Sequence, residues 1–156
     1  MIALRPYRPD DAATLLELFR DTIRRVNRRD YRPEQIAAWA SDDINPAAWT
    51  ARFEGRFVQI AQENEARPVG FAELEPDGHI DRFYVSADYQ GQGVGRMLIE
   101  AILAEAARRD IAELKVEASI TARPFFERHG FETLARQTVL CRGVPLDNFC
   151  MRRVNK

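Results

Sequence analysis

The fold is decided by residues 84–98, which read YVSADYQGQGVGRML. A strand-like run ends near the start of this stretch and a helical pattern opens at its end, so the glycines at 91, 93 and 95 lie between the two. A helix N-terminus offers unpaired backbone N–H groups and about half a positive charge. Glycines let an anion approach that backbone without obstruction from Cβ atoms, so the stretch predicts a phosphate-containing ligand.

The glycine spacing excludes two familiar phosphate loops. The Walker pattern needs a Lys followed by Ser or Thr, and neither occurs at that point. The dinucleotide fingerprint needs G-x-G-x-x-G, whereas these glycines alternate and follow a run of short strands typical of an antiparallel meander. What remains is the pattern Gln-x-x-Gly-x-Gly.

Composition limits the class of protein. The chain has 156 residues, 46% of them hydrophobic, with 23 Lys and Arg against 24 Asp and Glu. This length predicts one domain over residues 1–156, and the balanced charge argues against a nucleic-acid partner. No run approaches the ~18 apolar residues of a membrane span. The two cysteines, Cys141 and Cys150, flank a predicted hairpin, where they could face each other as reduced thiols in a cytoplasmic protein.

Hydrophobic periodicity and turn residues predict the order of elements. Strands are expected at 2–5, 57–61, 69–74, 79–85, 113–117, 131–140 and 146–154, and helices at about 12–26, 33–40, 94–109 and 121–129. A loose stretch is expected around Pro46 and Trp49. The strand from 113 follows a helical crossover, so it is expected parallel to the strand that ends at Val85. The fold class is therefore α/β, with a mixed sheet and helices on both of its faces.

Two motifs resemble those of a known family. Residues 84–98 resemble motif A of the GNAT superfamily of N-acyltransferases, and residues 118–131, ASITARPFFERHGF, resemble its motif B. The segments YRPEQI at 31–36, CRG at 141–143 and NFCMR at 148–152 look like the YafP-like branch. The resemblance covers essentially the whole chain, and it implies the GNAT fold and acetyl transfer from acetyl-CoA to a primary amine, with no metal.

The resemblance also implies where the coenzyme binds. It would enter a gap between the strand ending at Val85 and the strand ending at Glu117, with the amides from Gly91 to Arg96 on its pyrophosphate. The implied set is Phe83, Tyr84, Val85, Gln90, Gly91, Gln92, Gly93, Val94, Gly95, Arg96, Ser119, Ala122, Phe125 and Phe126.

The acceptor amine must lose a proton before it can attack a thioester, because an ammonium has no lone pair. Asp81 is the first choice of base, since its even separation from Val85 predicts that both side chains share one sheet face. An Asp81 paired with an arginine is the competing interpretation. Glu117 is an alternative base, as are Glu73 and Glu75, and His79 is expected to be an exposed surface residue.

The proton donor departs from the family pattern. Many members place a Tyr where this chain has Phe126, and an Asn where it has Ser119. Phe126 has no proton to donate to the leaving thiolate. Tyr84, Tyr31, Ser119 or water would have to substitute, or the thiolate leaves without a dedicated acid.

In this superfamily the first two helices and the final hairpin enclose the acceptor. The residues that fall there include Asn27, Tyr31, Trp39 and Asn148. An aromatic floor with carboxylates suits a small cationic amine. Acetylation of a protein lysine, an N-terminus or an aminoacyl-tRNA is an alternative, as is a non-catalytic acyl-CoA-binding module; monomer and homodimer both stay open.

Overall fold

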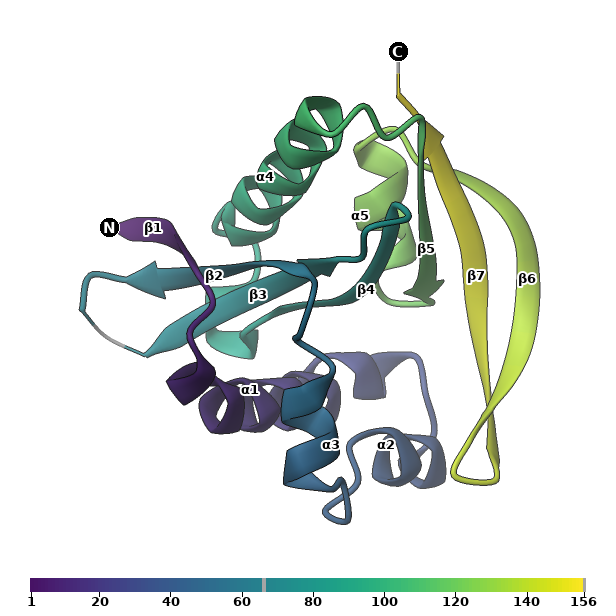
Figure 1. The fold of residues 1–156 in the computed structure, drawn as a ribbon. Helices are drawn as coiled ribbons and strands as arrows, with labels where there is room; N and C mark the ends of the chain where they lie inside the picture. The colour runs from purple at the N-terminus through teal and green to yellow at the C-terminus, as the bar shows by residue number, and fades with distance from the viewer. Residues whose placement is uncertain (66, 156) are drawn as a thin grey trace.

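The computed structural model describes residues 1–65 and 67–155, and its centre is a seven-stranded sheet (Figure 1). The strand order is β1-β2-β3-β4-β5-β7-β6. The bounds are β1 Ile2–Pro6, β2 Phe57–Glu63, β3 Pro68–Leu74, β4 His79–Val85, β5 Glu113–Ser119, β6 Glu132–Cys141 and β7 Val144–Val154. Neighbours pair antiparallel except β4 and β5, which pair parallel, so the predicted mixed sheet is confirmed.

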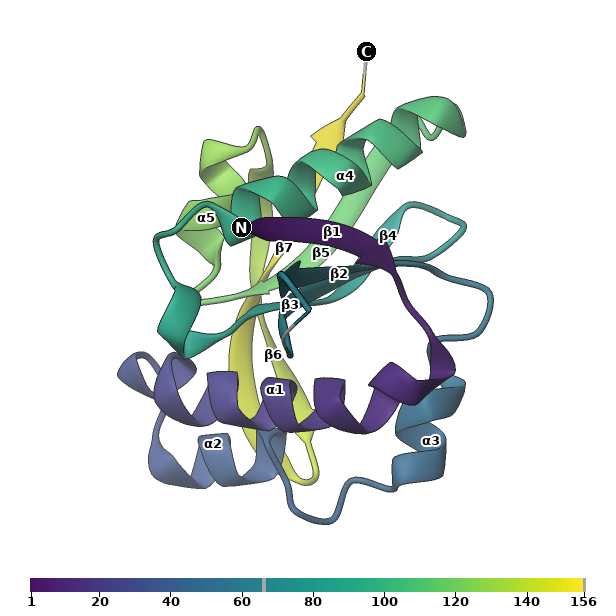
Figure 2. The ribbon, with the colours of Figure 1, turned by 90° about the vertical axis from the view of Figure 1, so that its left-hand side faces the viewer.

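Helices cover both faces of the sheet (Figures 1 and 2). On one face lie α4 (Val94–Arg108) and α5 (Arg123–Arg128), and on the other α1 (Ala12–Arg25), α2 (Pro33–Trp39) and α3 (Pro46–Ala51). Short 3-10 turns are η1 (Pro9–Asp11), η2 (Asn27–Arg29) and η3 (Ala87–Tyr89). Among the described residues, no helix is both long and apolar enough to cross a membrane.

The helix α3 was expected to be a loose stretch, and that prediction is wrong. Asn45 caps this helix by accepting a hydrogen bond from the Ala48 amide at 3.0 Å, and Pro46 occupies its first turn. Trp49 is buried, and its indole Nε1 donates to the Ala12 carbonyl at 2.9 Å. A helix of six residues with a single buried anchor, Trp49, is too short to show helical periodicity in the sequence.

Each face of the sheet has its own core. Under α4 the core includes Leu98, Ile102 and Leu114, and under α1–α3 it includes Leu15, Ile23 and Phe71. Apolar residues at helical spacing on α1 and α4 supply both cores, because each helix buries one side against the sheet. The two cores hold the sheet from both faces. The strand pairing at the seam in the middle of the sheet, however, differs from the rest.

That seam lies between β4 and β5, whose backbones pair only briefly. The register joins His79 to Lys115 and Ile80 to Val116, and among the described residues no further rung joins these strands. From there β5 pairs with β7 and β4 pairs with β3, so the two strands are free to splay. A gap opens in the sheet in the direction of Val85 and Ser119.

A bulge in β4 changes which side chains share a face. The register with β3 passes from Ala72↔Phe83 to Leu74↔Ile80, so one residue of β3 opposes two of β4. Phe83 and Val85 pack on the α4 side, while Arg82 stacks over Trp49 and Phe53 on the other side. The prediction that Asp81 and Val85 share a face is therefore wrong, because the extra residue shifts the alternation.

The two cysteines do not face each other across the final hairpin. Cys141 is in register with Val144, whereas Cys150 is in register with Ala135 and Glu117. Both thiols are free.

Candidate active site

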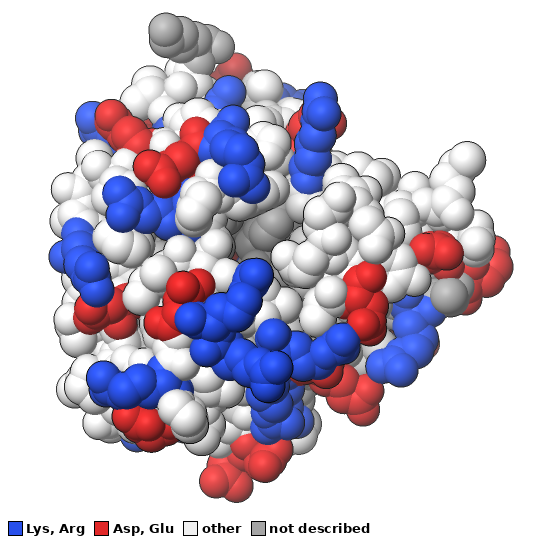
Figure 3. Space-filling model, turned by 180° about the vertical axis from the view of Figure 1, so that it is seen from behind, with Lys and Arg blue, Asp and Glu red and all other residues white. Residues whose placement is uncertain are grey.

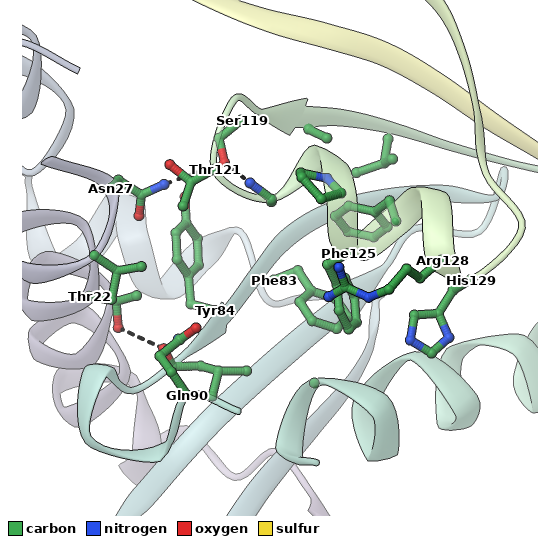
Figure 4. Close-up of a pocket in the computed structure, with 18 of the residues that line it drawn as sticks. Thr22, Asn27, Phe83, Tyr84, Gln90, Ser119, Thr121, Phe125, Arg128 and His129 are labelled. Atoms are coloured by element: carbon green, nitrogen blue, oxygen red, sulfur yellow. Dashed lines mark hydrogen bonds between the residues drawn. The ribbon is translucent and has the colours of Figure 1, made fainter. Parts of the chain in front are cut away.

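A cavity of about 560 Å³ occupies the gap between β4 and β5 (Figure 4). Its lining includes the loop before α4 on one side and α1, η2 and α2 on the other, so it passes through the sheet. Most of the residues predicted from the two motifs line it, among them Phe83, Tyr84, Val85, Gln90, Gly91, Gly93, Gly95, Arg96, Ser119, Ala122, Phe125 and Phe126. Two predicted residues, Gln92 and Val94, are not in the lining: Gln92 donates to the Asp88 carbonyl, and Val94 is buried in the core.

The loop before α4 has the backbone conformation that only glycine adopts easily. Gly91 and Gly93 have φ values of 72° and 84°, and Gly93 immediately precedes the first helical residue. A Cβ atom built on either glycine would meet no atom within 4 Å, so both point into open space. The side-chain amide of Gln90 stabilises the loop by donating a hydrogen bond from Nε2 to the Val85 carbonyl at 2.7 Å. The result is an open cradle at a helix N-terminus, which suits a diphosphate.

Aromatic rings form the wall next to this cradle. Phe83 lies 5.3 Å from Phe125 and 5.5 Å from Phe126 between ring centroids. Phe126 is almost completely buried and also contacts Phe131, so it joins this wall to the core. This wall suits the apolar stretch of a pantetheine arm.

The mouth of the cavity is basic. Arg96 and Arg128 line it, Arg29 lines the cavity from η2, and Figure 3 shows basic side chains gathered beside a hollow on this face of the molecule. His129 also lines it, but burial and the nearby Arg128 lower its pKa, so arginines carry the charge at neutral pH. A cationic mouth favours an anionic ligand.

The open edge of β4 presents backbone groups to the cavity. Ser86 donates its amide to the Val69 carbonyl at 2.8 Å, and antiparallel bonding alternates, so Tyr84 bonds to β3 and Val85 turns its N–H and C=O toward the gap. The Val85 carbonyl already accepts from Gln90 and, at 3.4 Å, from Thr22 Oγ1. The Val85 amide is therefore the donor that faces the gap.

Thr22 was missed by the sequence reasoning. Thr22 is buried although it is polar, and it lies within the apolar stripe of α1. A polar residue in an otherwise apolar stripe was the feature of the sequence that could have identified it. Thr121 was also missed; it lines the cavity and donates to Asp30 at 2.7 Å, which ties the start of α5 to the end of η2.

Two of the four predicted acceptor residues line the cavity. Asn27 donates to Ser119 Oγ at 3.4 Å, and Trp39 lies across the same end. Tyr31 and Asn148 do not line it among the described residues. The Tyr31 hydroxyl donates to the Asp147 carbonyl at 2.6 Å and accepts from the Ile120 amide at 2.9 Å, so it holds the cavity wall from behind. Asn148 instead accepts from Gln137 at 2.8 Å.

Tyr84 lies in the middle of the cavity (Figure 4). Its ring packs edge-on against Phe19 at 4.9 Å between centroids. Burial raises the pKa of the Tyr84 phenol well above its usual value. The hydroxyl is thus a hydrogen-bond donor at any working pH and a weak acid.

Asp81 reaches the cavity but is held by two arginines. It accepts hydrogen bonds from Arg52 and, at 2.6 Å, from Arg56. Burial alone would raise the pKa of Asp81, but the charges of Arg52 and Arg56 outweigh it and the pKa is lowered. A carboxylate stabilised in this way has little tendency to accept a proton.

Glu117 has a different environment. It lines the cavity with 43% of its side chain exposed, and its two oxygens lie 2.9 and 3.1 Å from His79 Nε2. The hydrogen bond with Glu117 raises the pKa of His79 to about 9, although burial opposes the shift. The expectation of an exposed surface histidine is therefore wrong: only 21% of the His79 side chain is exposed.

Within residues 1–65 and 67–155, no group of three or more His, Cys, Asp or Glu side chains is arranged to hold a metal ion.

Comparison with known proteins places the chain in a family. Residues 27–151 match the model of the acetyltransferase (GNAT) domain. The chain is 37% identical over 151 residues to YafP of Escherichia coli (strain K12), an uncharacterized N-acetyltransferase, with 97% of this chain and 95% of YafP covered.

Solved structures agree with this assignment. A GCN5-related N-acetyltransferase from Rhodopseudomonas palustris has a TM-score of 0.93 at 40% identity, with 98% of this chain and 95% of that chain covered. The PaiA N-acetyltransferase of Thermoplasma acidophilum, solved with coenzyme A, has a TM-score of 0.79 at 18% identity, with 99% of each chain covered, and shows the shared fold. The chain belongs to the GNAT family of N-acetyltransferases, enzymes that depend on an acyl-CoA donor, and the predicted YafP-like branch is confirmed.

Proposed function

We propose that this protein transfers the acetyl group of acetyl-CoA to the primary amine of a small molecule. The observation that carries the proposal is one continuous cavity that runs through the sheet from the glycine cradle to Glu117. A donor held at one end and an acceptor at the other would meet in the gap between β4 and β5. Positioning of this kind gives a large effective concentration of the amine.

The donor end is assigned to the following groups. The amides from Gly91 to Arg96 would hold the pyrophosphate, with Arg96 and Arg128 adding charge at the mouth. Phe83 and Phe125 would pack along the pantetheine arm. The residues present fit the group, because the space beyond Gly91 and Gly93 is free of protein atoms.

We assign the base to Glu117 in preference to Asp81. Both line the cavity and both pair with a cation, but Asp81 is held by two arginines with 19% of its side chain exposed, whereas Glu117 has one cationic partner, His79, and 43% of its side chain exposed. The Glu117 carboxylate would attract the ammonium form of the acceptor and accept its proton, directly or through a water molecule. The Val85 amide, which faces the gap, is the candidate donor to the oxyanion that develops on the thioester.

The leaving thiolate needs stabilisation that Phe126 cannot supply. Tyr84 is the candidate, since its hydroxyl lies in the cavity and its raised pKa keeps it protonated. A phenol of raised pKa is a poor acid, so we assign it a hydrogen bond to the departing sulfur in place of full proton transfer.

The acceptor end favours a small amine. Residues of α1, η2 and α2 bound this end, and Trp39 adds an aromatic side chain to the cavity that the Glu117 carboxylate also lines. Aromatic faces and carboxylates both attract an ammonium group.

The test is release of free thiol from acetyl-CoA in the presence of a panel of small amines, lysine peptides and N-terminal peptides. We expect turnover with at least one small amine and none with the peptides. Tight acetyl-CoA binding measured by calorimetry, with no thiol release for any acceptor, would contradict the proposal and favour a binding module. Turnover with peptides alone would favour a protein substrate.

A further inference from the structure

A pair of side chains bridges β4 and β5 at the point where their backbones stop pairing. His79 and Ile80 are in register with Lys115 and Val116, and Glu117 is the first residue of β5 beyond these rungs. Both oxygens of Glu117 lie within 3.1 Å of His79 Nε2. A carboxylate that lines the cavity is thus in direct contact with a side chain from the neighbouring strand β4.

The other side of His79 is also fixed. Its Nδ1 lies 3.4 Å from a Glu75 oxygen, and Glu75 in turn accepts from Arg56 at 2.7 Å. The same arginine binds Glu73 at 2.9 Å and Asp81 at 2.6 Å. The imidazole therefore lies between one carboxylate anchored to the buried charge network and a second that reaches the cavity.

We propose that His79 is a positioning residue for acetyl transfer, which holds the Glu117 carboxylate against the cavity wall in the orientation that receives the proton of the acceptor. This inference rests on the proposed function, because it assigns His79 a role only if Glu117 acts on the amine. A partly exposed glutamate otherwise samples several rotamers, and a misplacement of about 1 Å can cost a factor of 100 in rate.

The charges around His79 keep it a cation at neutral pH. The groups that face it are Glu75 and Asp77 before β4, Asp81 in β4, Lys115 and Glu117 in β5, and Arg56 before β2. Carboxylates outnumber cations in this set, which agrees with the rise of the pKa of His79 to about 9. The contact between His79 and Glu117 is therefore a charged pair below pH 9, and it loses its cation as the pH rises through that value.

The test compares three single variants with the wild-type enzyme. In His79→Gln we expect kcat to fall about tenfold with the affinity for coenzyme A unchanged, since positioning acts on the chemical step. His79→Lys keeps a cation and should recover most of kcat. Arg152→Gln removes another cation that joins strands through Glu113 and Glu132, outside the cavity lining, and should leave kcat unchanged.

The pH profile separates positioning from simple support of the fold. For the wild type, kcat should fall on the alkaline side near pH 9, and in His79→Lys this limb should move up toward ~10.4, the ordinary lysine value. The limb should be absent in His79→Gln. A kcat within about twofold of wild type in His79→Gln, or an equal loss of coenzyme A affinity, would overturn the proposal.

A second measurement does not depend on turnover. The pKa of His79, followed by the NMR signal of its ring protons, should fall from about 9 toward 6.5 in Glu117→Gln. A pKa unchanged by this substitution would overturn the proposal even in an active enzyme. A wild-type protein that releases no thiol while the pKa shifts as expected would instead contradict the proposed function alone.

Discussion

The two ends of the cavity are built from different materials. The donor end uses the backbone of one contiguous stretch, from Val85 to Arg96, with two glycines in the left-handed region. The acceptor end uses side chains from α1, α2, β4 and β5, which are far apart in sequence and meet only through tertiary contacts.

The carboxylates of the acceptor end are all paired. Asp81 contacts two arginines and Glu117 contacts a histidine, whereas the donor end presents a bare helix N-terminus. The contrast teaches that changes at the donor end should act on coenzyme affinity and changes at the acceptor end on kcat.

The donor end is tested by Gly93→Val. A side chain there would enter the space assigned to the pyrophosphate, so affinity for acetyl-CoA should fall on the order of 1,000-fold, about 4.1 kcal/mol. Calorimetric titration measures the effect. Gly143→Val is the matched control, because Gly143 has a similar φ of 81°, equally open surroundings and a place in the β6–β7 turn. Equal affinities in the two variants would refute the assignment of the loop.

The acceptor end is tested by Glu117→Gln. The amide keeps the size of the side chain but cannot accept a proton, so kcat should fall about 100-fold. Steady-state kinetics gives kcat, and calorimetry should show unchanged affinity for acetyl-CoA. If the affinity for acetyl-CoA falls together with kcat, Glu117 contributes to the donor end as well as to the acceptor end, contrary to our assignment.

The wall behind the acceptor end is tested by Tyr31→Phe. Loss of the hydroxyl leaves the Ile120 amide and the Asp147 carbonyl without their partner, which should cost about 1–3 kcal/mol in the free energy of unfolding. Urea denaturation measures it. Tyr7→Phe is the control, since the Tyr7 ring stacks on Phe53 and no hydrogen bond of its hydroxyl is seen in the described part of the chain. A loss of equal size in both variants would contradict the bridging role of Tyr31.

The smallest effect is expected for Asp81→Asn. Two arginines already satisfy this carboxylate, so turnover should stay within about threefold of wild type, ~0.65 kcal/mol of barrier. Thiol release compared with Glu117→Gln decides between the two carboxylates. A loss of turnover larger than that in Glu117→Gln would return the role of base to Asp81.

Most of the fold could be predicted because its signals are local. The helical stripes of α1 and α4 and the glycines before α4 each appear within about fifteen residues of sequence. The structure corrected two elements that depend on single residues: α3, anchored by Trp49, and the bulge of β4, which no local pattern announces. A bulge shifts every later side chain to the opposite face. Because the bulge was not predicted, Asp81 was assigned to the wrong face of the sheet.

The sequence by itself determined the family, the order of elements and the backbone cradle, because a glycine loop at a helix start carries its conformation in its own residues. The tertiary structure alone decided which partners surround each carboxylate at the cavity, and our proposal for the base rests on those partners. Burial and ion pairing fix the charge state of a side chain, and the partners of Asp81 and Glu117 come from segments 25 to 38 residues away in the chain.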